Sequence, residues 1–283
     1  MELTKTRSLS PRELALVEAW EADRRRALTL DDVQRDMGPG TTRHAAAVTA
    51  ARLRAKGFLT PLGKGLYALV PVASMGVAAG DVAAYLDGLR QRGVRFYLGF
   101  DTAAGHYGWY PEAYGRVTLG VQALMRRALR TLDGGTFVRT FQADLSVFDD
   151  GVVAQTWHGV RLPVSTPEQT VLDLVRHPEL VDGYPGLLRV LERARDRADV
   201  HRLAEIAAER ASVRTQKRLG WLTERAGWTW REEDRERLVA GWSPNHRAAL
   251  GDGRGAAPHR WDERWRLVID VPERELEPEV GVR

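Results

Sequence analysis

Residues 41–70 read TTRHAAAVTAARLRAKGFLTPLGKGLYALV, and this stretch decides the fold of the N-terminal part of the chain. Its first half predicts an alanine-rich helix over 43–57. Thr41 or Thr42 can cap that helix, because a threonine oxygen accepts from a backbone N–H that has no partner in the first turn. Gly57 is typical of the position at which a helix stops.

The second half of the stretch predicts a β-hairpin. The apolar runs 58–62 and 66–70 are each strand-sized, and Gly63-Lys64-Gly65 joins them. Glycines on both sides of a short connection favour a tight turn between antiparallel strands. The side chain of Lys64 is therefore expected at the tip of the hairpin.

The segment before this stretch predicts two more helices. Ser10, Pro11 and Glu13 form a capping-box pattern at the start of an apolar stripe that ends near Arg25. Thr29 can cap a short helix over 30–37, which the sequence Gly-Pro-Gly then ends. The order helix, short helix, glycine turn, helix, basic hairpin is that of a winged helix-turn-helix, which we expect over residues 1–72.

The distribution of charge favours a polyanionic partner for this segment. The net charge of the chain is +4, and residues 1–70 carry all of it, with 12 basic and 8 acidic side chains. The 44 residues 37–80 contain no Asp or Glu. Such a stretch can also arise by chance. A local electrostatic field that is positive throughout is, however, the kind that attracts a polyanion such as nucleic acid.

These patterns give a set of candidate DNA-binding residues. The N-terminal end of a recognition helix meets base edges in the major groove, and basic side chains farther along or on the wing meet phosphates. The candidates for base contacts are Thr41, Thr42, Arg43 and His44, and those for phosphate contacts are Arg52, Arg54, Lys56 and Lys64.

The rest of the chain predicts a second, larger domain, so the expected fold class is α+β. We expect a linker at 73–80, a mixed domain over 81–270 and a disordered tail over 271–283. The mixed domain should contain a small, mostly antiparallel sheet and a helical C-terminal part. Its expected helices include one capped by Asp101 and one opened by Thr166. Six of the nine tryptophans lie between 221 and 265, where they either bury apolar area or form a partner surface.

Composition narrows the function classes. Cysteine is absent, which excludes disulfides, thiolate zinc sites and a cysteine nucleophile. We find neither a secretory signal nor an uncharged run long enough for a membrane span, and we expect a cytoplasmic protein with no cofactor and no metal. A nucleotidyltransferase needs paired carboxylates after a Gly-Gly turn, but the nearest match, Asp144-Leu145-Ser146 after Gly134-Gly135, lacks the second one.

Several stretches in order resemble one family, the AbiEi-type abortive-infection antitoxins. They are RAKGFLTPLGKGLYALVP, FDTAAGHYGWYPE, VRLPVSTPEQTVLDLVRHPEL, YPGLLRVL, RLGWLTERAGW and HRWDERWRLVID, which together span about residues 10–270. The resemblance implies an N-terminal domain that binds operator DNA and represses its own operon, and a C-terminal domain that neutralises a toxin.

The expected function is therefore that of a sequence-specific regulator that binds double-stranded DNA. High affinity would need a homodimer or two copies on an inverted repeat, because one winged domain contacts little DNA. One alternative is an interaction module that captures a toxin while its DNA binding is incidental. A metal-dependent nuclease or nucleotidyltransferase is a third possibility.

Overall fold

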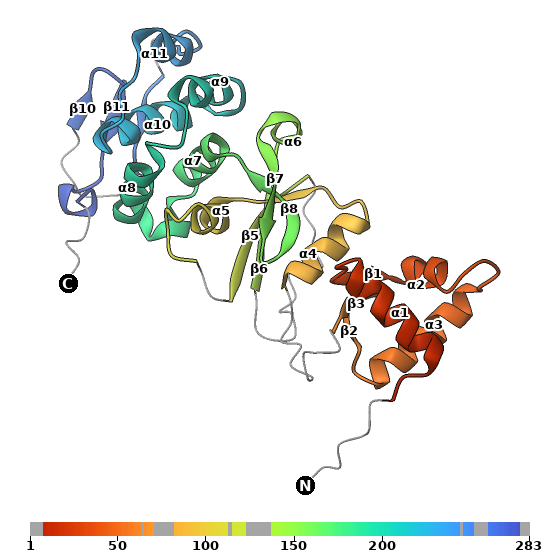
Figure 1. Cartoon of the computed structure of the whole chain (residues 1–283). Coiled ribbons are helices and arrows are strands. Elements are labelled where there is room, and N and C mark those ends of the chain that lie inside the picture. Colours follow the sequence, from red (N-terminus) through yellow and green to blue (C-terminus); the bar gives the residue numbers. More distant parts are fainter. Residues whose placement is uncertain are drawn as a thin grey trace. The chain divides into compact units, whose positions relative to one another are not determined.

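The structure is a computed structural model, and it describes residues 8–63, 65–70, 82–112, 115–122, 137–243, 246–251 and 260–277. The architecture is mixed, with helices and three small sheets (Figure 1). The chain divides into two compact units. The first consists of residues 1–96 with 127–138 and 155–162, and the second contains the remainder. The predicted linker at 73–80 and the tip residue Lys64 lie outside the described residues.

The N-terminal elements alternate helices and strands. Their bounds are α1 (Pro11–Ala22), β1 (Ala27–Thr29), α2 (Leu30–Asp36), α3 (Arg43–Ala55), β2 (Leu59–Gly63) and β3 (Leu66–Leu69). The strands form an antiparallel sheet in the order β1-β3-β2, with Leu28 opposite Tyr67 and Thr60 opposite Ala68. The sequence did not predict β1, which has only three residues.

The helices of this part pack on the sheet through one apolar core. Val17 and Trp20 of α1, Val33 of α2 and Leu53 of α3 are at most 1% exposed in this core. The indole of Trp20 also donates to Asp36 Oδ2 at 2.9 Å. This burial fixes which face of α3 points inward and therefore which face remains open to solvent.

The helix α4 (Val82–Gln91) packs on β1 and β3 and belongs to the first compact unit. Gly88 makes the close approach possible, because a Cβ at this position would lie 2.4 Å from Leu66 Cδ1. At the end of the helix, Gln91 Nε2 donates to the carbonyl of Ala27 at 3.2 Å. These contacts hold the last turn of α4 against the N-terminal elements.

A five-stranded sheet follows in the order β6-β5-β4-β8-β7. Its strands are β4 (Phe96–Leu98), β5 (Arg116–Val121), β6 (Phe137–Gln142), β7 (Val152–Trp157) and β8 (Val160–Ser165). β4 and β8 run parallel, with Leu98 opposite Val164. The short helices beside these strands are α5 (Phe100–His106) and α6 (Val147–Asp150).

The predicted cap at Asp101 is wrong. α5 begins two residues earlier than a cap at Asp101 requires, with Gly99 at the N-cap and no side-chain cap. Asp101 instead lies inside the helix, 1% exposed, where Arg116 donates to its Oδ2 from Nε at 3.0 Å and from Nη2 at 2.7 Å. A buried carboxylate needs a charged donor more than the helix start needs a cap.

The C-terminal part is helical with a small sheet. Its elements are α7 (Pro167–Arg176), η1 (Pro178–Val181), α8 (Gly183–Ala194), α9 (Val200–Arg210), α10 (Val213–Arg225), α11 (Glu232–Val239), β9 (Ala248–Ala249), β10 (Arg260–Asp262), β11 (Leu267–Ile269) and η2 (Glu273–Glu275). As predicted, Thr166 caps α7 by accepting from the backbone of Gln169.

Five of the six clustered tryptophans are buried in the core of this part, which favours the apolar-burial interpretation. They are Trp221, Trp228, Trp230, Trp242 and Trp265. Trp261 differs, since 42% of it is exposed. The expected disordered tail is wrong for residues 271–277, because η2 forms there and Leu276 is 1% exposed against the core.

Within the described ranges, every helix is too short or too polar to cross a bilayer. The same ranges contain no group of three or more side chains that could together hold a metal ion.

Candidate nucleic-acid interface

The turn between α2 and α3 is built by local hydrogen bonds. Thr29 and Asp32 form a reciprocal capping box at the start of α2. Gly38 and Gly40, with φ of 100° and 83°, turn the chain back after that helix. Gln34 Nε2 then donates to the carbonyl of Thr41 at 2.9 Å, which ties α2 to the residue before the next cap. These bonds fix the angle at which α3 leaves the turn.

The helix α3 has one buried and one exposed face. Ala46, Ala50 and Leu53 are fully buried, and the small alanines let α3 lie close to α2. The residues left on the exposed side are Thr42, Arg43, His44, Ala51, Arg52, Arg54 and Ala55. α3 contains no acidic residue, so the exposed face has only neutral and basic side chains.

The predicted base-contacting residues lie together at the N-terminal end of α3. Thr42 is the N-cap, and its Oγ accepts from the backbone of Ala45 at 3.1 Å. His44 is exposed beside it. Thr41 is half-buried, and its carbonyl is occupied by Gln34. The structure therefore brings these candidates together but commits one oxygen of each threonine to the turn itself.

Arg43 forms an ion pair with Asp31 of α2, and both side chains are mostly exposed, at 65% and 70%. The sequence analysis did not anticipate this pair. The ion pair orients the guanidinium of Arg43 at the start of α3 and places the carboxylate of Asp31 beside it. That carboxylate would also face the phosphates of an approaching duplex.

The predicted phosphate-contacting residues fall into two groups. Arg52 and Arg54 are exposed, and neither has an ion-pair partner among the described residues. Lys56, by contrast, donates from Nζ to Glu13 Oε2 at 2.6 Å and is one-third exposed. Lys56 therefore holds the end of α3 to α1. The role predicted for Lys64 lies outside the described residues.

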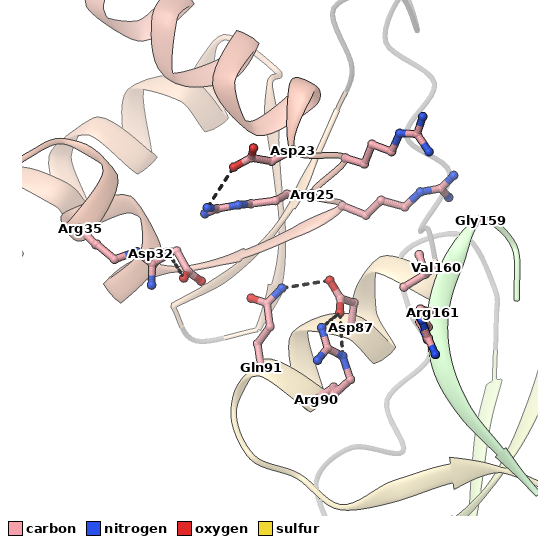
Figure 2. Close-up of a pocket in the computed structure, with 12 residues that line it drawn as sticks. Asp23, Arg25, Asp32, Arg35, Asp87, Arg90, Gln91, Gly159, Val160 and Arg161 are labelled. Atoms are coloured by element: carbon pink, nitrogen blue, oxygen red, sulfur yellow. Dashed lines mark hydrogen bonds and ion pairs between the residues drawn. The ribbon is translucent and has the colours of Figure 1, made fainter. Parts of the chain in front are cut away.

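A basic pocket that the sequence did not suggest lies in the same compact unit (Figure 2). It is lined by residues that precede β1, by α2, by the end of α4 and by the start of β8. Figure 2 shows Arg25 reaching Asp23, and both Arg90 and Gln91 reaching Asp87. No local pattern could have found this pocket, because its arginines come from four separate segments.

Two carboxylates of the second compact unit, Asp150 and Asp173, are engaged in internal bonds. Asp150, which follows the near-miss nucleotidyltransferase motif, pairs with Arg202 and Arg210. Asp173 accepts from Tyr97 Oη at 3.0 Å and from Gln169 Nε2 at 2.8 Å. Burial raises the pKa of Asp173 to about 6, and Arg176 and the two hydrogen bonds oppose that shift. These contacts give both carboxylates a structural role.

Comparison with known proteins confirms part of the resemblance found in the sequence. Residues 97–225 match the family of the AbiEi antitoxin C-terminal domain. A solved crystal structure, that of the RV2827C protein from Mycobacterium tuberculosis, is similar in fold, with a TM-score of 0.66 and 16% sequence identity over 92% of each chain. No curated protein matches the chain.

Proposed function

We propose that this chain, which carries an AbiEi-type antitoxin C-terminal domain at residues 97–225, is a DNA-binding regulator of antitoxin type. In this proposal residues 8–70 act as a winged helix-turn-helix, with α3 as the recognition helix and the β2–β3 hairpin as the wing. The order of the elements, the antiparallel sheet β1-β3-β2 and the packing of α3 on α2 support it.

One observation carries the proposal: the N-terminal end of α3 is exposed and basic. Arg43 and His44 face solvent there, while the opposite face of the helix is buried. An arginine at this end of a recognition helix can donate two hydrogen bonds to a guanine in the major groove. Arg52 and Arg54 would then meet the phosphates, which carry no sequence information but add affinity.

A gel-shift titration tests the proposal. Duplexes that tile the region upstream of the chain's own gene are compared with scrambled duplexes of the same length. The wild-type protein should prefer one tile, and two copies should bind an inverted repeat within it. Arg43→Ala should reduce that preference by about 1–3 kcal/mol. Lys64→Ala should weaken binding to both kinds of duplex and lower the slope of log K against log salt by about one.

Arg231→Ala is the matched control, because this exposed arginine belongs to the second compact unit. Its affinities should equal those of the wild type. Equal losses of Arg43→Ala on specific and scrambled duplexes would contradict the role of Arg43 in base recognition. A wild-type protein that prefers no tile would contradict the proposal as a whole.

The antitoxin part of the proposal concerns a protein partner. The family match lies outside residues 1–96, so toxin neutralisation would be a property of the second part of the chain. Co-expression with the adjacent reading frame should rescue growth if that frame encodes the toxin. The triple variant Arg43→Ala, Arg52→Ala, Arg54→Ala should still rescue, while it no longer represses a reporter placed behind the upstream region.

A second candidate function, toxin capture with incidental DNA binding, predicts a different outcome of the same experiment. Growth rescue would persist in the wild type, but neither protein would repress the reporter. For the enzyme alternative, incubation of labelled DNA, RNA and nucleoside triphosphates with Mg²⁺ or Mn²⁺ is the direct assay, and we expect no turnover.

A further inference from the structure

Two concave surfaces of the first compact unit lie next to each other. The first, the basic pocket of Figure 2, has a volume of about 350 Å³. The second, of about 550 Å³, lies between the N-terminal ends of α2 and α3 and the end of α4. Both are lined by Asp32, Arg35 and Gln91. The shared residues make the two hollows neighbours, and we call them together the arginine groove.

The arginine groove has an excess of positive charge. Its lining contains eight arginines and four aspartates, with no lysine and no glutamate. The arginines are Arg24, Arg25, Arg26, Arg35, Arg43, Arg90, Arg92 and Arg161. Each aspartate has an arginine partner within the groove: Asp23 with Arg25, Asp31 with Arg43, Asp32 with Arg35 and Asp87 with Arg90. The lining therefore has four more arginines than aspartates, and two of them, Arg24 and Arg161, have no ion-pair partner in the described part of the chain.

The chemistry of the lining indicates what it binds. An arginine can donate two parallel hydrogen bonds to one phosphate, which makes it suited to phosphate recognition. The lining contains no Phe, Tyr or Trp, so it offers no surface on which an unpaired base could stack. The arginine groove therefore fits the sugar-phosphate backbone of a duplex better than single-stranded nucleic acid.

The groove also begins at the proposed recognition helix. Arg43, the first residue of α3, lines one end of it, and Arg24 and Arg161 line the other hollow. α4 is held to β1 and β3 by the Gly88–Leu66 approach and the Gln91 hydrogen bond, so the arginines of its last turn have a defined place beside α2. A duplex that reached Arg43 would have backbone phosphates available for the rest of the groove.

We propose that the arginine groove binds backbone phosphates of the same duplex that α3 reads, so that the DNA footprint extends beyond the winged domain onto α4 and the start of β8. This inference rests on the proposed function and adds a second contact region to it. Arg24 and Arg161 are the most informative residues, because both are exposed and neither has an ion-pair partner in the described part of the chain.

The test compares two double variants of the full chain. Arg24→Gln with Arg161→Gln removes two charges from the groove without leaving an aspartate unpaired. The matched control, Arg195→Gln with Arg231→Gln, removes two exposed arginines from the second compact unit. Binding is measured by fluorescence anisotropy between 50 and 300 mM salt, that is, over roughly the range in which counterion release dominates affinity. The duplexes are the preferred upstream tile and a scrambled one.

The groove variant should lower the slope of log K against log salt by about two, since each lost phosphate contact contributes about 0.9. The loss of affinity should be equal on the preferred and scrambled duplexes. A longer duplex should increase the affinity of the wild type more than that of the variant. Thermal unfolding of both variants checks that they are folded. If the groove variant misfolds, the single substitution Arg161→Gln replaces it, with an expected slope change of about one.

The outcomes separate the two proposals. The folded groove variant could bind with sequence preference and keep the wild-type slope of log K against log salt. That result would overturn the inference and leave the proposed function intact. Absence of duplex binding by the wild type would overturn both. Binding of inorganic phosphate at millimolar concentration with no change in the DNA slope would mark the groove as a site for a free anion, and would also overturn the inference.

Discussion

Lys56, the residue that ends α3, donates from Nζ to Oε2 of Glu13 in the first turn of α1, with 2.6 Å between the two atoms. Glu13 also closes the capping box of α1 by accepting from the backbone of Ser10 at 2.8 Å. One buried carboxylate therefore connects the start of the first helix with the end of the proposed recognition helix.

Lys56→Met should lower the free energy of unfolding by about 2 kcal/mol, because the 8% exposed Glu13 carboxylate would lose its charged donor. Chemical denaturation at pH 7 measures the change. Arg54→Ala, an exposed substitution in the same helix, should stay within about 0.5 kcal/mol of the wild type. Equal stability of Lys56→Met and wild type would show that the ion pair contributes nothing.

The same contact predicts an acid dependence. Burial raises the pKa of Glu13, but hydrogen bonds from Lys56 and Ser10 outweigh burial and hold the pKa below the usual 4.5. A lowered carboxylate pKa gives stability that is present above 4.5 and is lost as the pH falls through the folded-state value. The stability difference between wild type and Lys56→Met should therefore be full at pH 6 and shrink in acid, as measured by denaturation at a series of pH values.

Asp31→Asn should tighten DNA binding. Asp31 and Arg43 form an exposed pair at the mouth of the α2–α3 turn, where the carboxylate would repel phosphates and compete for the guanidinium. We expect an increase of about two- to fivefold in affinity at 100 mM salt, with a smaller gain at high salt, since exposed charges are screened there. Anisotropy titrations measure it. Asp149→Asn, an exposed acid of α6, is the control, and weaker binding of Asp31→Asn would mean that the pair is needed to position Arg43.

The caps show how far the sequence could predict the fold. The caps at Ser10, Thr29 and Thr166 were predicted correctly, because a cap depends only on residues within one turn of the helix start. The cap at Asp101 was not, because Arg116 of β5 donates to that carboxylate from 15 residues away. Hydrogen bonds between residues close in the sequence can therefore be predicted from the sequence, whereas a partner distant in the sequence cannot.

The candidate site divides in the same way. Arg43 and His44 could be found from their position at a helix start. The hydrogen bond from Lys56 to Glu13, which lies 43 residues away, could not be predicted in this way. The arginine groove had no sequence signal either, because Arg24, Arg90 and Arg161 lie far apart in the sequence and line the pocket together only in the folded chain.

Gly220→Ala should destabilise the C-terminal core. Gly220 lies in α10 against Trp265, and a Cβ there would be 2.1 Å from Cζ3 of the fully buried ring. Alanine normally favours a helix over glycine by about 1 kcal/mol, but the clash should reverse the sign and lower stability by about 1–3 kcal/mol. Thermal unfolding followed by tryptophan fluorescence measures it. Gly241→Ala, where a Cβ meets no atom within 4 Å, should leave the midpoint nearly unchanged, and a stabilised Gly220→Ala would show that the ring moves freely.

Asp173→Asn should raise stability at neutral pH. Burial raises the pKa of Asp173 to about 6, so its folded form takes up a proton more readily than its unfolded form, whose ordinary pKa is 3.8. The resulting stability is fully present below 3.8 and is lost as the pH rises through about 6. Asparagine has the same shape without the charge. Its oxygen can accept from Gln169 Nε2, and its amide can donate to the Tyr97 hydroxyl, which is able to accept.

We therefore expect the free energy of unfolding of the variant to exceed that of the wild type by about 3 kcal/mol at pH 7.5, since burial raises the pKa from 3.8 to about 6 and one pKa unit is worth about 1.4 kcal/mol. The difference should vanish near pH 4, where the wild-type carboxyl is protonated in the folded state. Urea denaturation at pH 4, 6 and 7.5 measures both values, with Asp144→Asn as an exposed control. A variant that is less stable at pH 7.5 would mean that the charge of Asp173 is needed, and that its attraction to the neighbouring guanidiniums of Arg176 and Arg210 outweighs burial.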